Sequence, residues 1–269
     1  MLERGPRMVK KYLGLYGAFF RASMIADLEF RFNFVTRIVT DIFWYAAQII
    51  AFEVLYQHTK IIGNWNLSQT RVFLGMLFVV DALYMIIMSE NLERFSDKVR
   101  KGELDLILAK PVNAQFMVSF QRVSTALFGN LAIGTGWLIW SLSQLPDFSW
   151  WRLGWLLILI PSALVFIYSS RFMMSSTAIV FTRSENLQFL WYQIYKLGMR
   201  PDAIYVPWLK LIFMSVLPIA MIASVPSRAL LDPPEPWLFL WTPMLAIFFL
   251  WLTAKVWHRC LRAYSSASS

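Results

Sequence analysis

The chain has 269 residues, of which 58% are hydrophobic and 17% aromatic, and its formal net charge is +9. An ordinary soluble domain is about 45–50% apolar, and here the excess is gathered in continuous blocks, which predicts several membrane-spanning helices and no separate soluble domain. The single cysteine, Cys260, excludes an internal disulfide framework. The positive charge does not predict a nucleic-acid partner, because basic residues collect in the cytoplasmic loops of membrane proteins.

The first 35 residues mix basic side chains with apolar ones. Phe20, Met24 and Leu28 are spaced four apart and therefore share one face of a helix. We expect residues 1–35 to form an amphipathic helix in the cytoplasmic interface, with its basic face toward the lipid bilayer. A plain cytoplasmic extension is the alternative.

The apolar blocks that follow predict an all-α polytopic membrane protein. Spans are expected at residues 38–57, 72–89, 115–141 and 237–257, and a further one begins near Trp151. Small residues in the third span would let helices approach closely. They are Gly129, Gly134 and Gly136.

Two interpretations fit the region after Trp151. The first ends the fourth span at Ser170 and crosses again at residues 203–225. The second continues the fourth span to about Phe181, crosses back with residues 186–204 and folds residues 205–231 into the outer leaflet as a re-entrant segment. Prolines interrupt this last segment and favour the second interpretation. They are Pro207, Pro218 and Pro226.

Both interpretations give six crossings, which place the two termini on the same side. Under the second, 18 of the 25 lysines and arginines lie on the side of the termini. The positive-inside rule therefore predicts cytoplasmic termini and a cytoplasmic location for the charged loop at residues 90–113, which we call the island.

Enzyme signatures are poor in this sequence. The two histidines, His58 and His258, are predicted near opposite membrane faces, and no phosphate-binding loop of the G-x-x-x-x-G-K-[ST] type occurs. We therefore expect no enzyme activity and no cofactor bound by this chain. Asp81, the deepest charged residue in an apolar block, is a candidate for the translocation path, although structural pairing is the commoner role.

The island carries the clearest functional signal. Leu92, Phe95 and Val99 would share one helical face, Gly102 permits a sharp reversal and Pro111 ends regular structure before the next span. Charges of both signs interleaved with leucines predict a docking surface for a soluble partner. A solvated loop that obeys the positive-inside rule is the alternative.

Residues 99–111, Val-Arg-Lys-Gly-Glu-Leu-Asp-Leu-Ile-Leu-Ala-Lys-Pro, resemble the loop "basic–x–Gly–x–Leu–Asp … Leu–x–Arg–Pro" of type-2 (ABC-2-like) ABC exporter permeases, in a branch of uncharacterised permease components. Lys110 stands where that family usually has arginine. A second match is the proline-punctuated segment before the last span, which includes Arg200-Pro201 and Val216-Leu217-Pro218.

The resemblance implies a permease subunit in a bacterial cytoplasmic (inner) membrane, with six spans, a coupling helix in the island and a re-entrant outer segment before the sixth span. It implies a separate ABC ATPase subunit, which uses the ATP, and a second related permease or a second copy of this chain. The residues implied in ATPase coupling are Arg100, Gly102, Glu103, Leu104, Asp105, Lys110 and Pro111. An ATPase-independent channel or scaffold is the alternative function.

Overall fold

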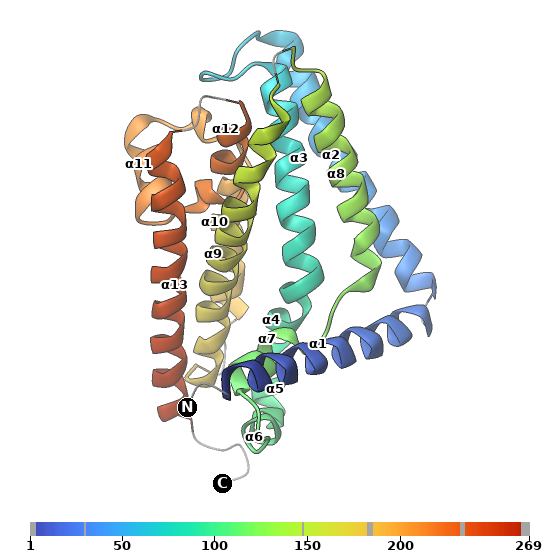
Figure 1. The fold of residues 1–269 in the computed structure, drawn as a ribbon, viewed down its shortest axis with the longest axis vertical. Helices are drawn as coiled ribbons and strands as arrows, with labels where there is room; N and C mark the ends of the chain where they lie inside the picture. Colours follow the sequence, from blue (N-terminus) through green and yellow to red (C-terminus); the bar gives the residue numbers. More distant parts are fainter. Residues whose placement is uncertain (1–3, 30, 147, 182–184, 232–234, 265–269) are drawn as a thin grey trace.

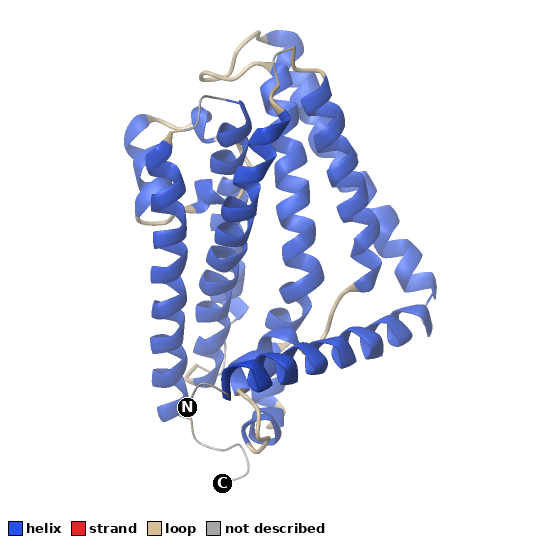
Figure 2. Cartoon of the chain, viewed as in Figure 1, coloured by secondary structure: helices blue, strands red, loops and turns tan. Residues whose placement is uncertain are grey.

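A computed structural model describes residues 4–29, 31–146, 148–181, 185–231 and 235–264. The described residues form helices joined by loops (Figure 2), and their only β pairing is an isolated bridge between Ile62 and Trp65. The long helices are α1 (Arg4–Glu29), α2 (Arg31–His58), α3 (Leu67–Tyr84), α8 (Phe128–Ser143), α9 (Leu156–Ser176), α10 (Glu185–Gly198) and α13 (Pro236–Arg262).

Shorter helices connect these long ones. They are η1 (Met85–Ser89), α4 (Glu90–Glu93), α5 (Phe95–Arg100), α6 (Glu103–Leu108), α7 (Ala114–Phe120), η2 (Thr125–Leu127), η3 (Trp150–Trp155), η4 (Thr177–Ile179), η5 (Asp202–Ile204), α11 (Pro207–Ser215), η6 (Ile219–Met221) and α12 (Ser224–Leu231).

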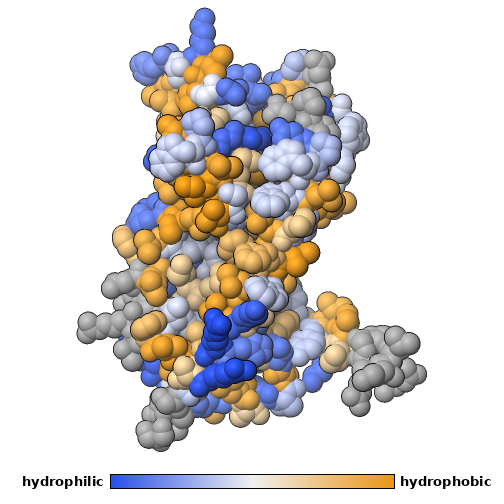
Figure 3. Space-filling view, turned by 90° about the vertical axis from the view of Figure 1, so that its left-hand side faces the viewer, coloured by the Kyte–Doolittle hydropathy of each residue, from blue (hydrophilic) through white to orange (hydrophobic). Residues whose placement is uncertain are grey.

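Among the residues that the structure describes, five helical segments are long and apolar enough to cross a membrane, which confirms the prediction of an all-helical polytopic membrane protein. They are Phe34–His58, Leu67–Arg100, Thr125–Ser143, Trp150–Ile179 and Pro236–Arg262. On the face shown in Figure 3, hydrophobic residues fill the middle and hydrophilic residues gather toward the ends, as expected for a surface that contacts lipid.

The long helices α2, α3, α8, α9 and α13 run along the longest axis of the molecule, and α1 lies across one end of them (Figure 1). The island helices α5 and α6 lie at this same end, which we call the island end. Helices α11 and α12 lie toward the opposite end.

Helix α3 forms the centre of the bundle. Its sequence is apolar on all sides, and most of its residues are buried, including Phe73, Leu77 and Phe78. It packs most extensively against α8. A capping box begins α3, because the Asn66 side chain accepts from the backbone N–H of Gln69 and the Gln69 side chain accepts from that of Asn66.

The third predicted span, residues 115–141, is wrong as a single helix. The chain forms α7, leaves helical geometry at residues 121–124 and resumes with η2 and α8. Side chains from elsewhere satisfy the backbone of this break: the Asn91 side chain accepts from the N–H of Arg122 at 2.8 Å, and the Ser23 hydroxyl accepts from that of Val123 at 3.0 Å. These tertiary hydrogen bonds replace the helical ones.

The N-terminal prediction of one helix over residues 1–35 needs its boundary corrected. Helix α1 ends at Glu29 and α2 begins at Arg31, so residues 31–35 belong to α2. Of the predicted face, Phe20 is partly buried and meets Phe128 edge to face at 6.1 Å, whereas Met24 and Leu28 are exposed.

The helix boundaries after α9 contradict the first interpretation and agree with the extended fourth span of the second, whereas its crossing at residues 186–204 and its re-entrant segment stay predictions. The helical run that begins at Trp150 continues past Ser170 to Ile179, and residues 203–225 do not form one helix but contain α11, of nine residues, and η6. Most of the predicted turn at residues 182–185 lies outside the described residues. Helix α10 has 14 residues, whereas a helix needs about 20 to cross the hydrocarbon core, so α10 is not among the five segments named above.

Candidate functional site

The island folds as two short helices with a sharp reversal between them. Helix α5 ends at Arg100, and Gly102 adopts a left-handed conformation with φ of 73° before α6 begins at Glu103. A side chain with a Cβ rarely adopts this conformation, so glycine is the residue that permits the turn.

The underside of the island is fastened to the helix bundle. Leu92, Phe95 and Leu104 are fully buried. The Phe95 ring lies 6.5 Å from that of Phe172 in α9 and 6.1 Å from that of Trp257 in α13. Because buried aromatic clusters of this kind are close-packed, a force on the island would be transmitted to α9 and α13.

The residues predicted to couple to an ATPase divide into three sets according to their exposure. Arg100, Glu103, Lys110 and Pro111 are exposed, whereas Gly102 and Asp105 are half-buried. Leu104 points into the bundle with 0% exposure, so it anchors α6 and is not available to a partner. Leu106, which the predicted set omits, has 68% of its surface exposed on the same helix.

Helix α1 braces the end of the island. The Lys11 ammonium donates to the Pro111 carbonyl at 3.1 Å, and the Tyr12 hydroxyl accepts from the backbone N–H of Asn113 at 3.1 Å. The ring of Tyr12 also meets that of Phe116 edge to face at 4.8 Å. The amphipathic helix and the island are therefore one connected structure, which no local sequence pattern could indicate.

A second set of contacts joins α4 to α1 and to the break before η2. Glu90 accepts from Arg94 at 2.9 Å and from Arg122 at 2.8 Å. Asp27 of α1 accepts from the backbone N–H and the hydroxyl of Thr125 at 2.9 and 2.6 Å. These contacts hold α1, α4 and η2, which precedes α8, in a fixed relation.

Asp81 is buried in α3, with 7% of its surface exposed, and it accepts a hydrogen bond of 2.7 Å from the Tyr195 hydroxyl of α10. The contact pairs the Asp81 side chain with a polar group of another helix. This is the structural pairing expected as the commoner role of such a residue. The role of Asp81 in the translocation path stays a prediction.

Arg171 of α9 is a second charged residue that is buried among the helices, with 7% of its surface exposed. Its guanidinium stacks 5.1 Å from the centre of the Trp191 ring in α10 and lies 3.5 Å from Glu93 of α4. Arg171 therefore links the island to α10. Glu93, Arg171 and Trp191 are far apart in the sequence, so no sequence pattern predicts that they meet.

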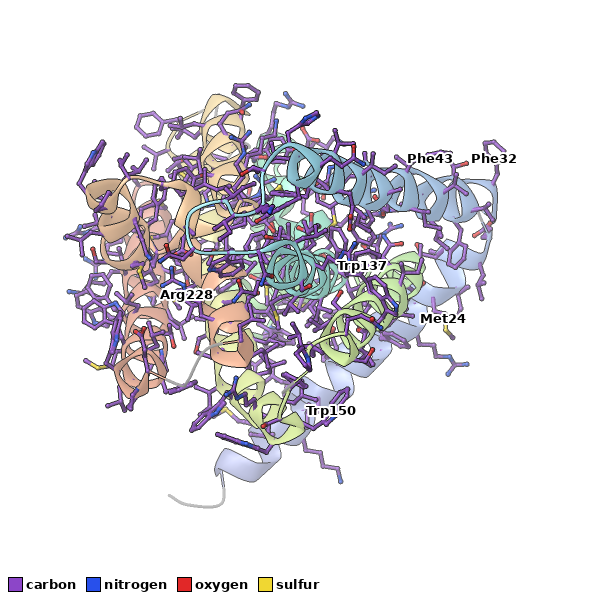
Figure 4. The ribbon with its side chains drawn as sticks, turned by 90° about the horizontal axis from the view of Figure 1, so that it is seen from above. Met24, Phe32, Phe43, Trp137, Trp150 and Arg228 are labelled. Atoms are coloured by element: carbon purple, nitrogen blue, oxygen red, sulfur yellow. The ribbon has the colours of Figure 1, made fainter. Side chains whose placement is uncertain are left out.

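The end of the molecule opposite the island holds a polar cavity of about 500 Å³. Its wall includes Lys210 of α11 and Arg228 of α12, which both bind the buried carboxylate of Asp202. Figure 4 shows Arg228 lying among the helices at this end. Prolines divide this region into short helices, and these ion pairs hold η5, α11 and α12 together.

No group of three or more metal-ligating side chains occurs among the described residues. The arrangement as a whole defines a class of protein: a helical membrane protein with a charged helical platform at one end of its spans and a polar, ion-paired cluster at the other.

The comparison with protein families agrees with this class. The family described as "ABC-2 family transporter protein" matches residues 42–268, so the chain belongs to the ABC-2 transporter family and is a permease component of an ABC transporter. No curated protein and no solved structure matched the chain.

Proposed function

We propose that this chain forms half of the translocation pathway of an ATP-driven exporter and that a separate ATPase subunit drives it through the island. The second half is a related permease or a second copy of this chain. The observation that carries the proposal is the platform of α5 and α6, whose outer surface is exposed while Phe95 and Leu104 are buried beneath it.

The chain crosses the membrane six times in this proposal, and α10 supplies the additional crossing. At the island end, Gln188 donates to Ser96 at 2.8 Å. Further along α10, the Tyr195 hydroxyl donates to Asp81. Beyond the end of α10, Ala203 of η5 lies so close to the α2–α3 loop that a Cβ on Gly63 would be 2.3 Å from the Ala203 carbonyl oxygen. The segment therefore extends from one end of the bundle to the other.

Helix α10 alone is too short for this crossing, so we propose that residues outside the α-helix complete it. A helix of 14 residues is about 21 Å long, which is shorter than the ~30 Å hydrocarbon core, so residues 199–204 complete the passage. Residues 205–231 then form the short helices α11 and α12, which we place in the outer leaflet as a re-entrant segment.

The orientation follows from charge. With six crossings, 18 of the 25 lysines and arginines lie at the island end, which makes this end cytoplasmic in a bacterial inner membrane. Both termini and the island then face the compartment that contains ATP. Nucleotide biases the permease only through contacts that differ between its two states, and the island is the surface where such contacts are possible.

Association with the ATPase can be tested by affinity purification from native membranes. We expect the wild-type chain to retain a nucleotide-binding subunit and Leu106→Glu to lose most of it, because a charge would replace an exposed apolar contact on α6. Ile61→Glu is the matched control, since Ile61 is 60% exposed in the loop at the opposite end. Purified chain that conducts solute without any ATPase would instead support the channel hypothesis.

A further inference from the structure

A small cavity lies where α1, α2 and α4 meet, and the proposed function does not use it. Its volume is about 180 Å³. The lining includes three guanidinium groups, two carboxylates and one aromatic ring. They belong to Arg37, Arg94, Arg122, Asp27, Glu90 and Phe34. These side chains carry a net charge of +1.

Both carboxylates are already engaged by other groups. Glu90 accepts from Arg94 and Arg122 at 2.9 and 2.8 Å. Asp27 accepts twice from Thr125 and lies 3.6 Å from Arg122. The two acids of the cavity therefore satisfy two of the three arginines.

Arg37 is the remaining cation. It is half-buried on α2. Among the described residues it forms no hydrogen bond and no ion pair within 4 Å, and it interacts with the Asp41 carboxylate only through longer-range electrostatic attraction. The acid one helical turn further along, Asp41, accepts a hydrogen bond from Asn130 instead. A partly buried guanidinium whose attracting carboxylate accepts its hydrogen bond from another residue is only partly compensated, so an anion from outside the chain would stabilise it.

The surroundings indicate which kind of anion this is. The cavity lies at the beginning of the candidate span Phe34–His58, where a membrane helix meets the headgroups. Met24 and Phe32, at the corner between α1 and α2, point away from the bundle with 40% and 83% of their surfaces exposed (Figure 4). This apolar surface beside a cationic cavity fits acyl chains attached to a phosphate.

We propose that this cavity binds the phosphate headgroup of an anionic phospholipid from the leaflet at the island end. Arg37 is its main contact. Arg94, whose side chain is 58% exposed, is the second. A bound lipid would also hold together α1, α2 and α4, because Asp27 and Glu90 link the cavity wall to the start of η2.

The proposal can be tested by native mass spectrometry of the full chain after exchange into mixed phosphatidylglycerol and phosphatidylcholine. We expect the wild-type chain to retain phosphatidylglycerol preferentially and Arg37→Gln to weaken this preference by roughly tenfold, as for the loss of one charge-assisted hydrogen bond. Arg21→Gln removes the same charge from an exposed position of α1 and should keep the preference. Equal retention in Arg37→Gln and wild type would overturn the proposal.

A thermal unfolding series in nanodiscs separates lipid from free anion and guards against misfolding. Phosphatidylglycerol should raise the Tm of the wild-type chain and of Arg37→Lys, which keeps the positive charge, but not that of Arg37→Gln. Inorganic phosphate added to phosphatidylcholine nanodiscs should not reproduce the increase. If it does, the site binds a soluble anion and the lipid proposal is wrong.

Discussion

At the scale of single residues, the most consequential group is Asp202 at the end opposite the island. Its side chain is 3% exposed, and its carboxylate binds Arg228, which is 14% exposed, and lies 3.6 Å from Lys210. Its backbone N–H also donates to the Ser224 hydroxyl at 3.1 Å. One residue thus holds η5, α11 and α12 together, which the proline-rich sequence could not do through helical hydrogen bonds alone.

We expect Asp202→Ala to destabilise the protein by about 3 kcal/mol, because it leaves the Arg228 charge buried without a partner. Thermal unfolding in detergent measures the effect. Asp97→Ala is the matched control, since it removes an exposed pair with Arg100 that is worth less than about 1 kcal/mol. Equal losses in the two variants would contradict the structural role given to Asp202.

The sequence predicts the structure at a single residue well where a local backbone conformation requires one type of residue. Gly102 is such a case, since the reversal in the island needs a left-handed residue. The contacts of Arg171 could not be predicted in this way, because the ring of Trp191 and the carboxylate of Glu93 that surround it come from other helices. Hydropathy gives a charge its depth in the membrane but does not identify its partners.

At the scale of helices, glycines let α3 and α8 approach each other closely. A Cβ on Gly75 of α3 would lie 2.7 Å from the Cα of Leu138, and one on Gly134 of α8 would lie 3.0 Å from the Cβ of Phe78. The sequence predicted close approach at three glycines of the third span. Gly134 confirms it, whereas Gly136 has open space around it and Gly129 meets only one side-chain atom.

We expect Gly75→Ala to lower stability by about 1–3 kcal/mol, because the added methyl group meets backbone atoms of α8 that cannot move aside. Gly136→Ala is the control on the opposing helix. It should be neutral or stabilising by up to about 1 kcal/mol, since alanine favours a helix more than glycine does. Thermal unfolding of both variants in the same detergent checks this, and a larger loss in Gly136→Ala would refute the packing.

The apolar blocks predicted where most of the long helices lie. They did not predict the break inside the third predicted span. Its backbone is satisfied by Asn91 and Ser23, which are distant in the sequence. Hydropathy averages over a window and cannot register such hydrogen bonds. The same reason explains why α10 remained ambiguous, since its buried face of Trp191 and Tyr195 is complementary to α9 and α3.

At the scale of the whole molecule, polar contacts connect the island to the rest of the bundle along two routes. Arg171 connects Glu93 to α10, and α10 reaches Asp81 in the central helix. Lys11 and Tyr12 connect the other side of the island to α1. A movement of α5 and α6 would therefore shift several helices at once. A permease that an ATPase drives from one end needs such a connection.

The reconstituted complex of permease and ATPase offers the most direct test of this coupling, through substrate-stimulated ATP hydrolysis. We expect Glu103→Lys/Asp105→Lys to retain basal hydrolysis and lose most of the stimulation, because the charges that α6 presents are reversed. Glu235→Lys reverses an exposed charge at the opposite end and should leave stimulation intact. Full stimulation in the double variant would contradict the claim that the island transmits the ATPase's work to the membrane helices.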